Sequence, residues 1–290
     1  MIAVMIWGST WIAIEFQLGV VEPEISIVYR FLAAAAILFT WCKYKELQLS
    51  FNPKSHLWFA VMGLLMFGLN YILAYRAQIY ITSALAAIAF SSMLWMNILN
   101  SRVFFGVRVG SRVYLGASLG VTGMVVLYGP QVAEVSLSDT VILGSALAVS
   151  GALLGSLGNM ASQAAQNSQL PVVPSNAWSM LYGGLLTAVV ALLQGHAFTF
   201  DTSAGYVISL AYLTVFGSVI AFGAYLTLLG RIGAHRAGYV TVMFPVIALI
   251  LSMLFEGLAL DLSIFLGFAL VLAGNLLVLT VRRSNRRADG

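Results

Sequence analysis

Two charged side chains, Glu15 and Arg30, fall within apolar stretches that are long enough to cross a membrane. Glu15 lies six residues before Val21, and Arg30 lies six residues after Glu24. Both are therefore about 9 Å deep at the rise of an α-helix. Consecutive antiparallel helices would place them at one level, facing each other. Because an isolated charge at that depth is costly, an ion pair or a wet cavity is expected.

The expected pair has three interpretations. It could clamp a helical hairpin, its carboxylate could take up a proton during a transport cycle, or the two charges could anchor a substrate. We favour the anchor as a hypothesis, because a zwitterionic amino acid offers one charge of each sign. The structural clamp remains an open alternative.

Tryptophans accompany Glu15 on its stretch. Trp7, Trp11 and Glu15 are spaced by four residues and therefore share one face of a helix. Trp7 is interpreted as an anchor at the membrane interface. Trp11 is too deep for that role, so it is either a cavity wall or packing.

Amide, hydroxyl and aromatic side chains recur within the other apolar stretches. Hydrogen bonds between helices explain many such amides. Aromatic faces combined with uncharged polar groups are also what a pocket for a planar, partly polar solute would use. On this reasoning the candidate substrate-binding residues, besides Glu15 and Arg30, are Trp11, Asn70, Tyr71, Tyr75, Ser91, Trp95, Asn159 and Gln163.

The sequence lacks the residues that an ATP-driven pump or an intramembrane hydrolase would need. A phosphate loop ends in Gly-Lys, and none of the three lysines follows a glycine. The four aspartates fall in loops or the tail, and the three histidines at the ends of apolar stretches, which disfavours an intramembrane hydrolase. No catalytic residue, metal site or cofactor is predicted. A channel is harder to exclude, although no carbonyl filter or charged ring is apparent.

Composition explains why these polar residues stand out. Of 290 residues, 61% are hydrophobic and 8% charged, against roughly 25% charged in soluble domains. The chain is predicted to be an all-α membrane protein, without a disulfide because it has one cysteine. Its net charge of +4 does not indicate nucleic-acid binding, because the basic residues lie between the apolar stretches.

Hydropathy predicts ten transmembrane helices. Their expected ranges are 3–21, 25–42, 57–75, 82–101, 113–129, 140–162, 175–193, 206–230, 237–255 and 262–281. The first is interpreted as a retained span, because no basic region precedes it. Pro245 falls within the ninth, where a proline usually marks a helix that lines a cavity.

The loops alternate in charge. Twelve of the fourteen Lys and Arg residues fall on one side, which should be the cytoplasm, so both termini and the tail 283–290 are expected inside. Residues 163–174 are expected to form a cytoplasmic loop, although they include no basic residue. The opposite loops are expected to hold Glu22 and Glu24, with Arg76 as their one basic residue.

The chain also matches itself at an offset of 151 residues. The matching pairs are Pro23 with Pro174, Gly106 with Gly257, Gly116 with Gly267 and Gly123 with Gly274. We therefore expect two repeats, 1–130 and 139–282. Because each contains five helices, the second would be inverted, with a central cavity and the substrate site between the halves.

At this point a family resemblance is visible. The resemblance rests on the following motifs: Trp7-Gly8-Ser9-Thr10-Trp11, Tyr29-Arg30-Phe31, and the run from Ala237 through Pro245 to Phe255-Glu256, followed by Gly267 and Gly274. The chain resembles the ten-helix, EamA-like exporters of the drug/metabolite transporter superfamily, and most of all the aromatic amino-acid exporters. The resemblance places the eighth and ninth helices at the pathway, which adds Tyr225, Tyr239 and Pro245 to the candidates. In a departure, Leu94 and Phe105 stand where the second half has Pro245 and Glu256.

These features predict a bacterial inner-membrane carrier. It would export small amphipathic metabolites, with aromatic and other neutral amino acids as the leading substrates, by alternating access. Its partners would be membrane lipid and a small-molecule substrate, and it would be a monomer or a homodimer. The alternatives are export of a nucleotide sugar or an organic cation, and, less favoured, a channel or an intramembrane enzyme.

Overall fold

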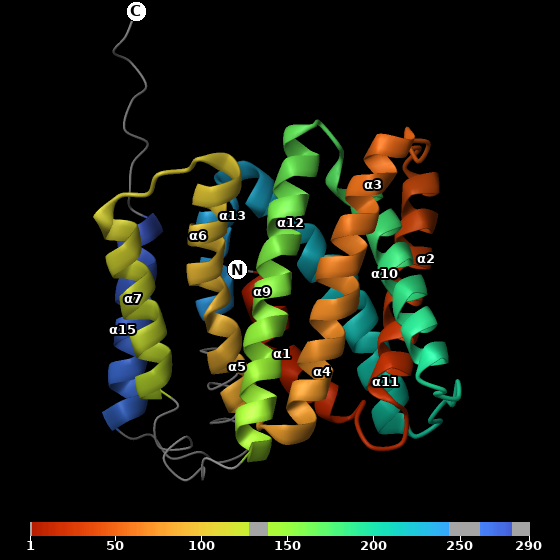
Figure 1. Cartoon of the computed structure of the whole chain (residues 1–290), viewed down its shortest axis with the longest axis horizontal. Helices are drawn as coiled ribbons and strands as arrows, with labels where there is room; N and C mark the ends of the chain where they lie inside the picture. Colours follow the sequence, from red (N-terminus) through yellow and green to blue (C-terminus); the bar gives the residue numbers. More distant parts are fainter. Residues whose placement is uncertain (1, 128–138, 244–261, 280–290) are drawn as a thin grey trace, which may run out of the picture.

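Helices form the first half of the chain (Figure 1). The computed structural model describes residues 2–127, 139–243 and 262–279, and within them it contains no strand. A continuous helical rod runs from Pro53 to Tyr80. The first-half elements are α1 (Ile2–Glu15), α2 (Pro23–Tyr44), α3 (Pro53–Met62), the π-helical segment η1 (Gly63–Leu69), α4 (Asn70–Tyr80), α5 (Ser83–Ser91), α6 (Met93–Phe105) and α7 (Ser111–Leu127).

The second half contains a similar series of helices. A second rod runs from Ala204 to Ile232. The elements are α9 (Asp139–Asn167), α10 (Val172–Leu193), α11 (Ala204–Tyr212), the π-helical segment η2 (Leu213–Ile220), α12 (Ala221–Ile232), α13 (Ala234–Ala237) and α15 (Leu262–Leu279). Most of the expected ninth span, Pro245 included, lies outside the described residues.

Five of the described helices have the length and composition to cross a membrane. These are Pro23–Tyr44, Pro53–Tyr80, Asp139–Asn167, Val172–Leu193 and Ala204–Ile232. Ile2–Glu15 is apolar but shorter. The expected first span, 3–21, was therefore too long, because the chain leaves the helix after Glu15, buries Gln17 and turns at Gly19, where φ is +116°.

Local signals start these helices where they begin. Proline stands at the first position of α2 and of α3, where its missing N–H costs nothing. Before α3, the Asn52 side chain accepts a hydrogen bond from the Ser55 backbone N–H at 2.9 Å. Gly106 ends α6 in the left-handed region. Each device satisfies or removes a backbone group that the helix end leaves over.

The boundaries of the two halves repeat. Helices α2 and α10 each have 22 residues, and the rods Pro53–Tyr80 and Ala204–Ile232 have 28 and 29. The rods begin 151 positions apart, and η1 and η2 end 151 positions apart. In Figure 1 the chain runs downward through α3 and α4 but upward through α11 and α12. The corresponding segments therefore run in opposite directions.

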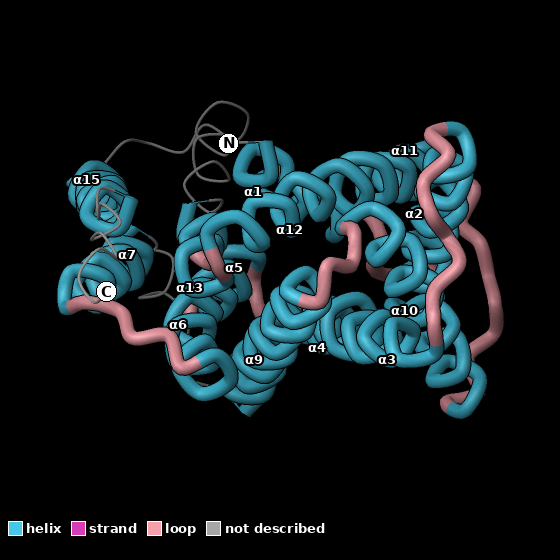
Figure 2. Tube along the Cα trace, turned by 90° about the horizontal axis from the view of Figure 1, so that it is seen from above, coloured by secondary structure: helices cyan, strands magenta, loops and turns pink. Residues whose placement is uncertain are grey.

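Helices α7 and α15 pack side by side at one edge of the molecule (Figures 1 and 2). A Cβ on Gly116 would lie 2.7 Å from the carbonyl oxygen of Gly274, and one on Gly123 would lie 2.8 Å from that of Gly267. At the offset of 151, Gly116 corresponds to Gly267 and Gly123 to Gly274, so the two contacts are equivalent. These glycines allow close approach of two helices, as small residues do in membranes.

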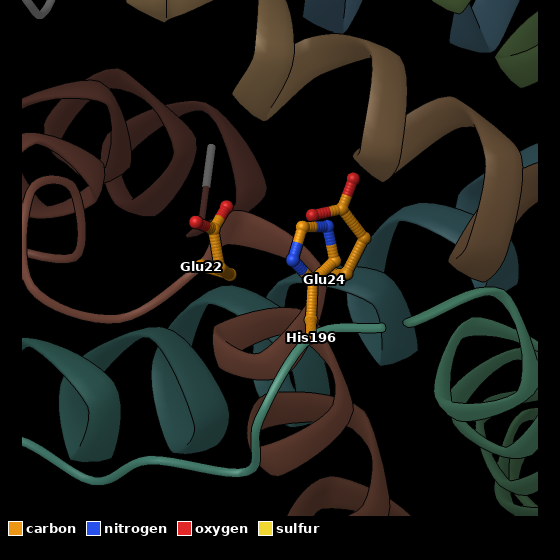
Figure 3. A group of neighbouring side chains, drawn as sticks. All are labelled: Glu22, Glu24 and His196. Atoms are coloured by element: carbon orange, nitrogen blue, oxygen red, sulfur yellow. The ribbon is translucent and has the colours of Figure 1, made fainter. Parts of the chain in front are cut away.

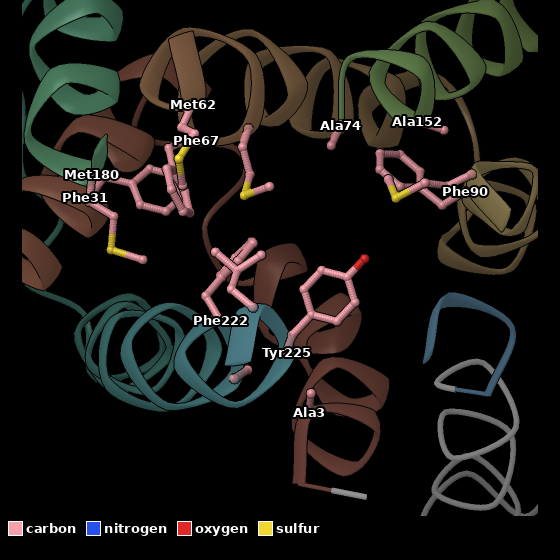
Figure 4. Packing of buried hydrophobic residues seen from close by; sticks show 14 of the residues in the cluster. Ala3, Phe31, Met62, Phe67, Ala74, Phe90, Ala152, Met180, Phe222 and Tyr225 are labelled. Atoms are coloured by element: carbon pink, nitrogen blue, oxygen red, sulfur yellow. The ribbon is translucent and has the colours of Figure 1, made fainter. Parts of the chain in front are cut away.

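The remaining described helices pack across the two halves. Helix α2 lies against α10, η1 against α10, and η2 against α2. Figure 4 shows the buried cluster between them, with Phe222 and Tyr225 pointing from α12 toward the side that carries Phe67 and Ala74. Ala74, Phe222 and Tyr225 also line the cavity described next.

Candidate functional site

A cavity of about 100 Å³ lies where α1, α2 and the first rod meet α9 and α12. This volume has room for several water molecules. Both halves of the chain contribute to its wall. Its lining residues are Trp7, Thr10, Trp11, Ile14, Arg30, Met66, Asn70, Tyr71, Ala74, Phe90, Met93, Gly155, Asn159, Phe222, Tyr225 and Thr241.

Arg30 is the one charged residue among the described residues of this lining, and it is 1% exposed. Its Nε donates a hydrogen bond to Ser218 Oγ at 2.9 Å, and its Nη1 donates to Tyr75 Oη at 3.2 Å. The guanidinium carbon lies 4.8 Å from the centre of the Tyr71 ring and 5.4 Å from that of Phe31. Hydroxyls and aromatic faces therefore replace water around this cation.

The π-helical segment η2 makes room for this arrangement. Ser218 both accepts the Arg30 hydrogen bond and donates its own to the Leu213 carbonyl at 3.1 Å. A Cβ on Gly217 would lie 3.0 Å from Arg30 Nη2 and 3.2 Å from Thr10 Cγ2. A wider helical turn that contains glycine thus brings backbone close to the guanidinium, and π-helical turns are frequent at functional sites.

Aromatic rings form much of the wall. Trp7 donates from Nε1 to the Gly217 carbonyl at 3.1 Å, and its ring lies 4.9 Å from that of Phe222 and 5.0 Å from that of Tyr225. The Trp11 ring lies 5.3 Å from that of Phe90. Edge-to-face geometry of this kind fixes the rings and leaves faces available to a planar solute.

A second polar group lies at the Tyr225 side of the cavity. Asn159 donates from Nδ2 to Asn97 Oδ1 at 3.2 Å, and both amides lie beside the Tyr225 hydroxyl. Within the described part of the chain, the buried Tyr225 hydroxyl and Asn97 Nδ2 have no hydrogen-bond partner. A bound solute or water could supply one, since buried polar groups are normally satisfied.

The lining is related by the offset of 151. Tyr71 corresponds to Phe222, Ala74 to Tyr225, and Phe90 to Thr241, and all six line the cavity. Arg30 corresponds to Leu181, which does not line it. The cavity is therefore shared between equivalent surfaces, but its cation comes from one half.

The structure brings some predicted site residues together and separates others. Trp11, Arg30, Asn70, Tyr71, Asn159 and Tyr225 line the cavity, and Tyr75 lies behind Arg30. Ser91 bonds the Ile88 carbonyl, Trp95 stacks on Tyr114, Gln163 accepts from the Ala234 backbone N–H, and Tyr239 donates to the Val113 carbonyl. These four make helix-to-helix or local contacts, and Pro245 is not described.

The expected pairing of Glu15 with Arg30 is not what the structure shows. Glu15 ends α1 on an exposed position, whereas Arg30 is buried against Ser218 and Tyr75. Within the described residues, no carboxylate lies within 4.0 Å of the Arg30 guanidinium. The early end of α1 removes the register on which the pairing depended.

Sequence reasoning missed Trp7, Phe222 and Met66 as wall residues. Trp7 was interpreted as an interface anchor, but its hydrogen bond to Gly217 and its ring contacts place it in the cavity. Its spacing of four residues from Trp11 was the available signal. For Phe222 and Met66, helical spacing alone does not separate a cavity wall from core.

An ion pair away from the cavity joins Glu24 and Arg76, which lie within helices and not in the loops expected for them. Arg76 belongs to α4, and it binds the fully buried Glu24 through Nε and Nη2, both at 2.9 Å. Glu22 lies 3.8 Å from Nη2, and His196 Nε2 lies 3.4 Å from it. Figure 3 shows Glu22, Glu24 and His196 together, with ligand atoms within 4.8 Å of one another. The arginine supplies the positive charge that these carboxylates need.

Comparison with known proteins decides the family. The sequence pattern described as the EamA-like transporter family matches residues 1–129 and 142–280. The chain belongs to the EamA-like transporter family. It is therefore a multi-pass membrane protein, and relatives in this family are named as transporters.

Individual relatives of this EamA-like chain are distant but match along most of its length. The "Uncharacterized inner membrane transporter YedA" of Escherichia coli is 24% identical over 86% of this chain and 78% of its own. The "Probable amino-acid metabolite efflux pump" of Escherichia coli is 23% identical over 94% of this chain and 91% of its own. A solved structure titled "Crystal structure of protein" superimposes with a TM-score of 0.79 at 19% identity, covering 95% and 93% of the two chains. The last comparison confirms the helical fold.

Proposed function

We propose that this EamA-like protein is a secondary transporter that exports small amphipathic metabolites, above all aromatic and other neutral amino acids, by alternating access. The observation that carries the proposal is a cavity with an aromatic wall, the Arg30 cation in its lining, and the Asn159 amide beside the Tyr225 hydroxyl, which has no hydrogen-bond partner among the described residues. This is the composition that a site for a planar, partly polar solute requires.

The opposite directions of corresponding helices support the mechanism. The rods begin at matching positions, run in opposite directions in Figure 1, and both contribute equivalent residues to the cavity. The family pattern also matches the chain in two segments, 1–129 and 142–280. Secondary transporters with inverted repeats bind substrate near the midplane, where the repeats meet. We extend this to two five-helix repeats, 1–130 and 139–282.

Relative motion of the halves would change contacts around the cavity. The Trp7 hydrogen bond to Gly217 and the Arg30 hydrogen bond to Ser218 both cross from one half to the other. So does the bond between Asn159 and Asn97. A solute that binds these groups exchanges hydrogen bonds with them, which gives it different free energies in the two states, as population shift requires.

The cellular setting is part of the proposal. The name of the YedA relative refers to the inner membrane, and the amino-acid efflux name of the other relative supports the substrate class. The distribution of Lys and Arg supports cytoplasmic termini. The protein would act as a monomer or a homodimer, with lipid around it.

Counterflow in liposomes tests the function. Liposomes that contain the purified protein are loaded inside with an unlabelled aromatic amino acid, with and without a pH step. They should accumulate the labelled amino acid at a rate that saturates with its external concentration. Trp11→Ala should reduce this at least about tenfold, because it removes a wall of the cavity. Trp41→Ala, at an exposed tryptophan of α2, should leave it unchanged.

The same experiment contains the outcomes that would overturn the proposal. Absence of counterflow for every amino acid, combined with counterflow of a nucleotide sugar or an organic cation, would move the chain to another substrate class. Non-saturating flux would indicate a channel. Conversion of the solute to a new product, seen by mass spectrometry, would indicate an enzyme.

A further inference from the structure

Arg30 is a buried cation with no carboxylate beside it in the part of the chain that the structure describes. Its side chain is 1% exposed, and within residues 2–127, 139–243 and 262–279 no carboxylate lies within 4.0 Å of it. The contrast with Arg76 is direct, because that less buried arginine has Glu24 at 2.9 Å. A charge removed from water is costly unless it is paired, so Arg30 is suited to an anion that arrives from outside the protein.

The guanidinium retains donors for such an anion. Arginine has five N–H donors, and the hydrogen bonds to Ser218 and Tyr75 use those of Nε and one of Nη1. Arg30 also forms part of the cavity wall. Two adjacent N–H groups of a guanidinium match the two oxygens of a carboxylate, which makes that pairing both strong and directional.

The described lining offers no comparable site for the opposite charge. Among the described lining residues there is no Asp and no Glu, and Glu15 lies at the exposed end of α1. An ammonium group could meet ring faces and amide oxygens but no carboxylate of this lining. The described lining therefore carries a positive charge and no negative one.

We propose that Arg30 binds the carboxylate of the transported solute, so that the cavity selects organic monocarboxylates with an aromatic or apolar body and does not require an ammonium group. This inference rests on the proposed function and narrows its substrate class. The zwitterion hypothesis drawn from Glu15 and Arg30 is replaced, because the carboxylate half of that pair is not beside the arginine.

Three solutes that share a phenyl ring but differ in charge test the proposal. L-phenylalanine carries both charges, 3-phenylpropanoate keeps only the carboxylate, and 2-phenylethylamine keeps only the ammonium. Binding to the purified wild-type protein at neutral pH is measured by isothermal titration calorimetry. The first two should bind within tenfold of each other, and the amine at least tenfold more weakly. Equal or tighter binding of the amine, or no binding of any of the three, would overturn the proposal.

Variants assign the selectivity to the arginine. Arg30→Gln should weaken 3-phenylpropanoate at least tenfold while leaving the amine unchanged, and Arg30→Lys should recover part of the loss. Arg102→Gln removes an exposed arginine of α6 and should alter neither. A purely structural Arg30 would change both solutes together, which would contradict the assignment. If Arg30→Gln does not fold, Ser218→Ala frees one donor and should preserve or increase the preference for the carboxylate.

Counterflow of the same three solutes separates the two proposals. Carboxylate-selective binding without counterflow would refute transport and leave the Arg30 site intact. Counterflow of the amine as efficient as that of 3-phenylpropanoate would support a carrier and refute the carboxylate site.

Discussion

Gly217 determines how much space the Arg30 guanidinium has. A methyl group there would lie 3.0 Å from Arg30 Nη2 and 3.2 Å from Thr10 Cγ2, closer than most real contacts. Gly217→Ala should therefore displace the guanidinium and lower counterflow by about tenfold, because small shifts of a binding group have large effects. Uptake into liposomes measures this.

A second glycine of the same rod is the control. Gly223 lies in α12, and a Cβ there would meet nothing within 4 Å. Gly223→Ala should leave counterflow unchanged and raise stability by about 0.5–1 kcal/mol, since alanine favours the helix. Equal loss of transport in Gly217→Ala and Gly223→Ala would contradict the prediction that position 217 controls the space of the Arg30 guanidinium.

His235 provides a prediction about pH. It lies in α13, outside the long apolar helices, and burial, followed by the charge of Arg236, lowers the pKa of its imidazole to about 4. The unfolded chain titrates this group near 6.5. Between these values the unfolded state binds the proton and the folded state does not, so stability should be complete above about pH 6.5 and fall as the pH drops toward 4.

NMR titration of the His235 ring in detergent checks the pKa, and thermal unfolding at several pH values checks the stability. His235→Gln should reduce the slope of stability against pH in this window. A ring that titrates near 6.5 in the folded protein would refute the prediction.

The chemical types of the site were predictable, but the direction of each side chain was not. Hydropathy and polarity selected Arg30 and Tyr71, which both line the cavity, because a polar group in an apolar stretch is expensive and needs a reason to be there. The same criterion selected Tyr239, whose hydroxyl instead bonds the Val113 carbonyl of a neighbouring helix. Depth along a helix follows from sequence, whereas rotation about its axis depends on packing against helices far away in the chain.

The link between α2 and α4 gives a prediction about stability. Glu24 is fully buried, and Arg76 binds it through two nitrogens. Arg76→Gln leaves a buried carboxylate without its cation and should cost about 3 kcal/mol. Glu24→Gln should cost less, because Arg76 keeps partial exposure and Glu22 nearby. Denaturant unfolding in micelles measures both.

The double variant makes the comparison decisive. With both charges removed, the loss should be smaller than the sum of the single losses, as expected for groups in direct contact. Additive losses would show that the two side chains do not stabilise each other in the folded state.

Hydropathy predicted where helices lie better than it predicted where they end or which turns are π-helical. The expected ranges 25–42 and 175–193 correspond to α2 and α10. The end of α1 at Glu15 and the π-helical segments η1 and η2 had no such signal. A glycine within an apolar run does not reveal whether the turn around it holds an extra residue. For this reason the pairing of Glu15 with Arg30 was wrong although both helices were expected.

The proposed inversion can be tested at two loops. Gln48 and Thr199 are 151 positions apart, both are exposed, and they lie in the loops after α2 and after α10. With Cys42 replaced by alanine, a cysteine at position 48 should react with a membrane-impermeant maleimide from the cytoplasmic side only. A cysteine at position 199 should react from the opposite side only. Labelling of both from one side would exclude inverted halves.

The two π-helical segments carry a consequence for the history of the chain. Each has hydrogen bonds that span one more residue than those of the flanking α-helix, and their ends are 151 positions apart. If the halves descend from one gene, the insertion was already present before that gene was copied and fused. An ancestral five-helix protein would then have assembled as an antiparallel pair of identical subunits, each with this wide turn, and a cation resembling Arg30 was either lost from one copy or acquired by the other after fusion.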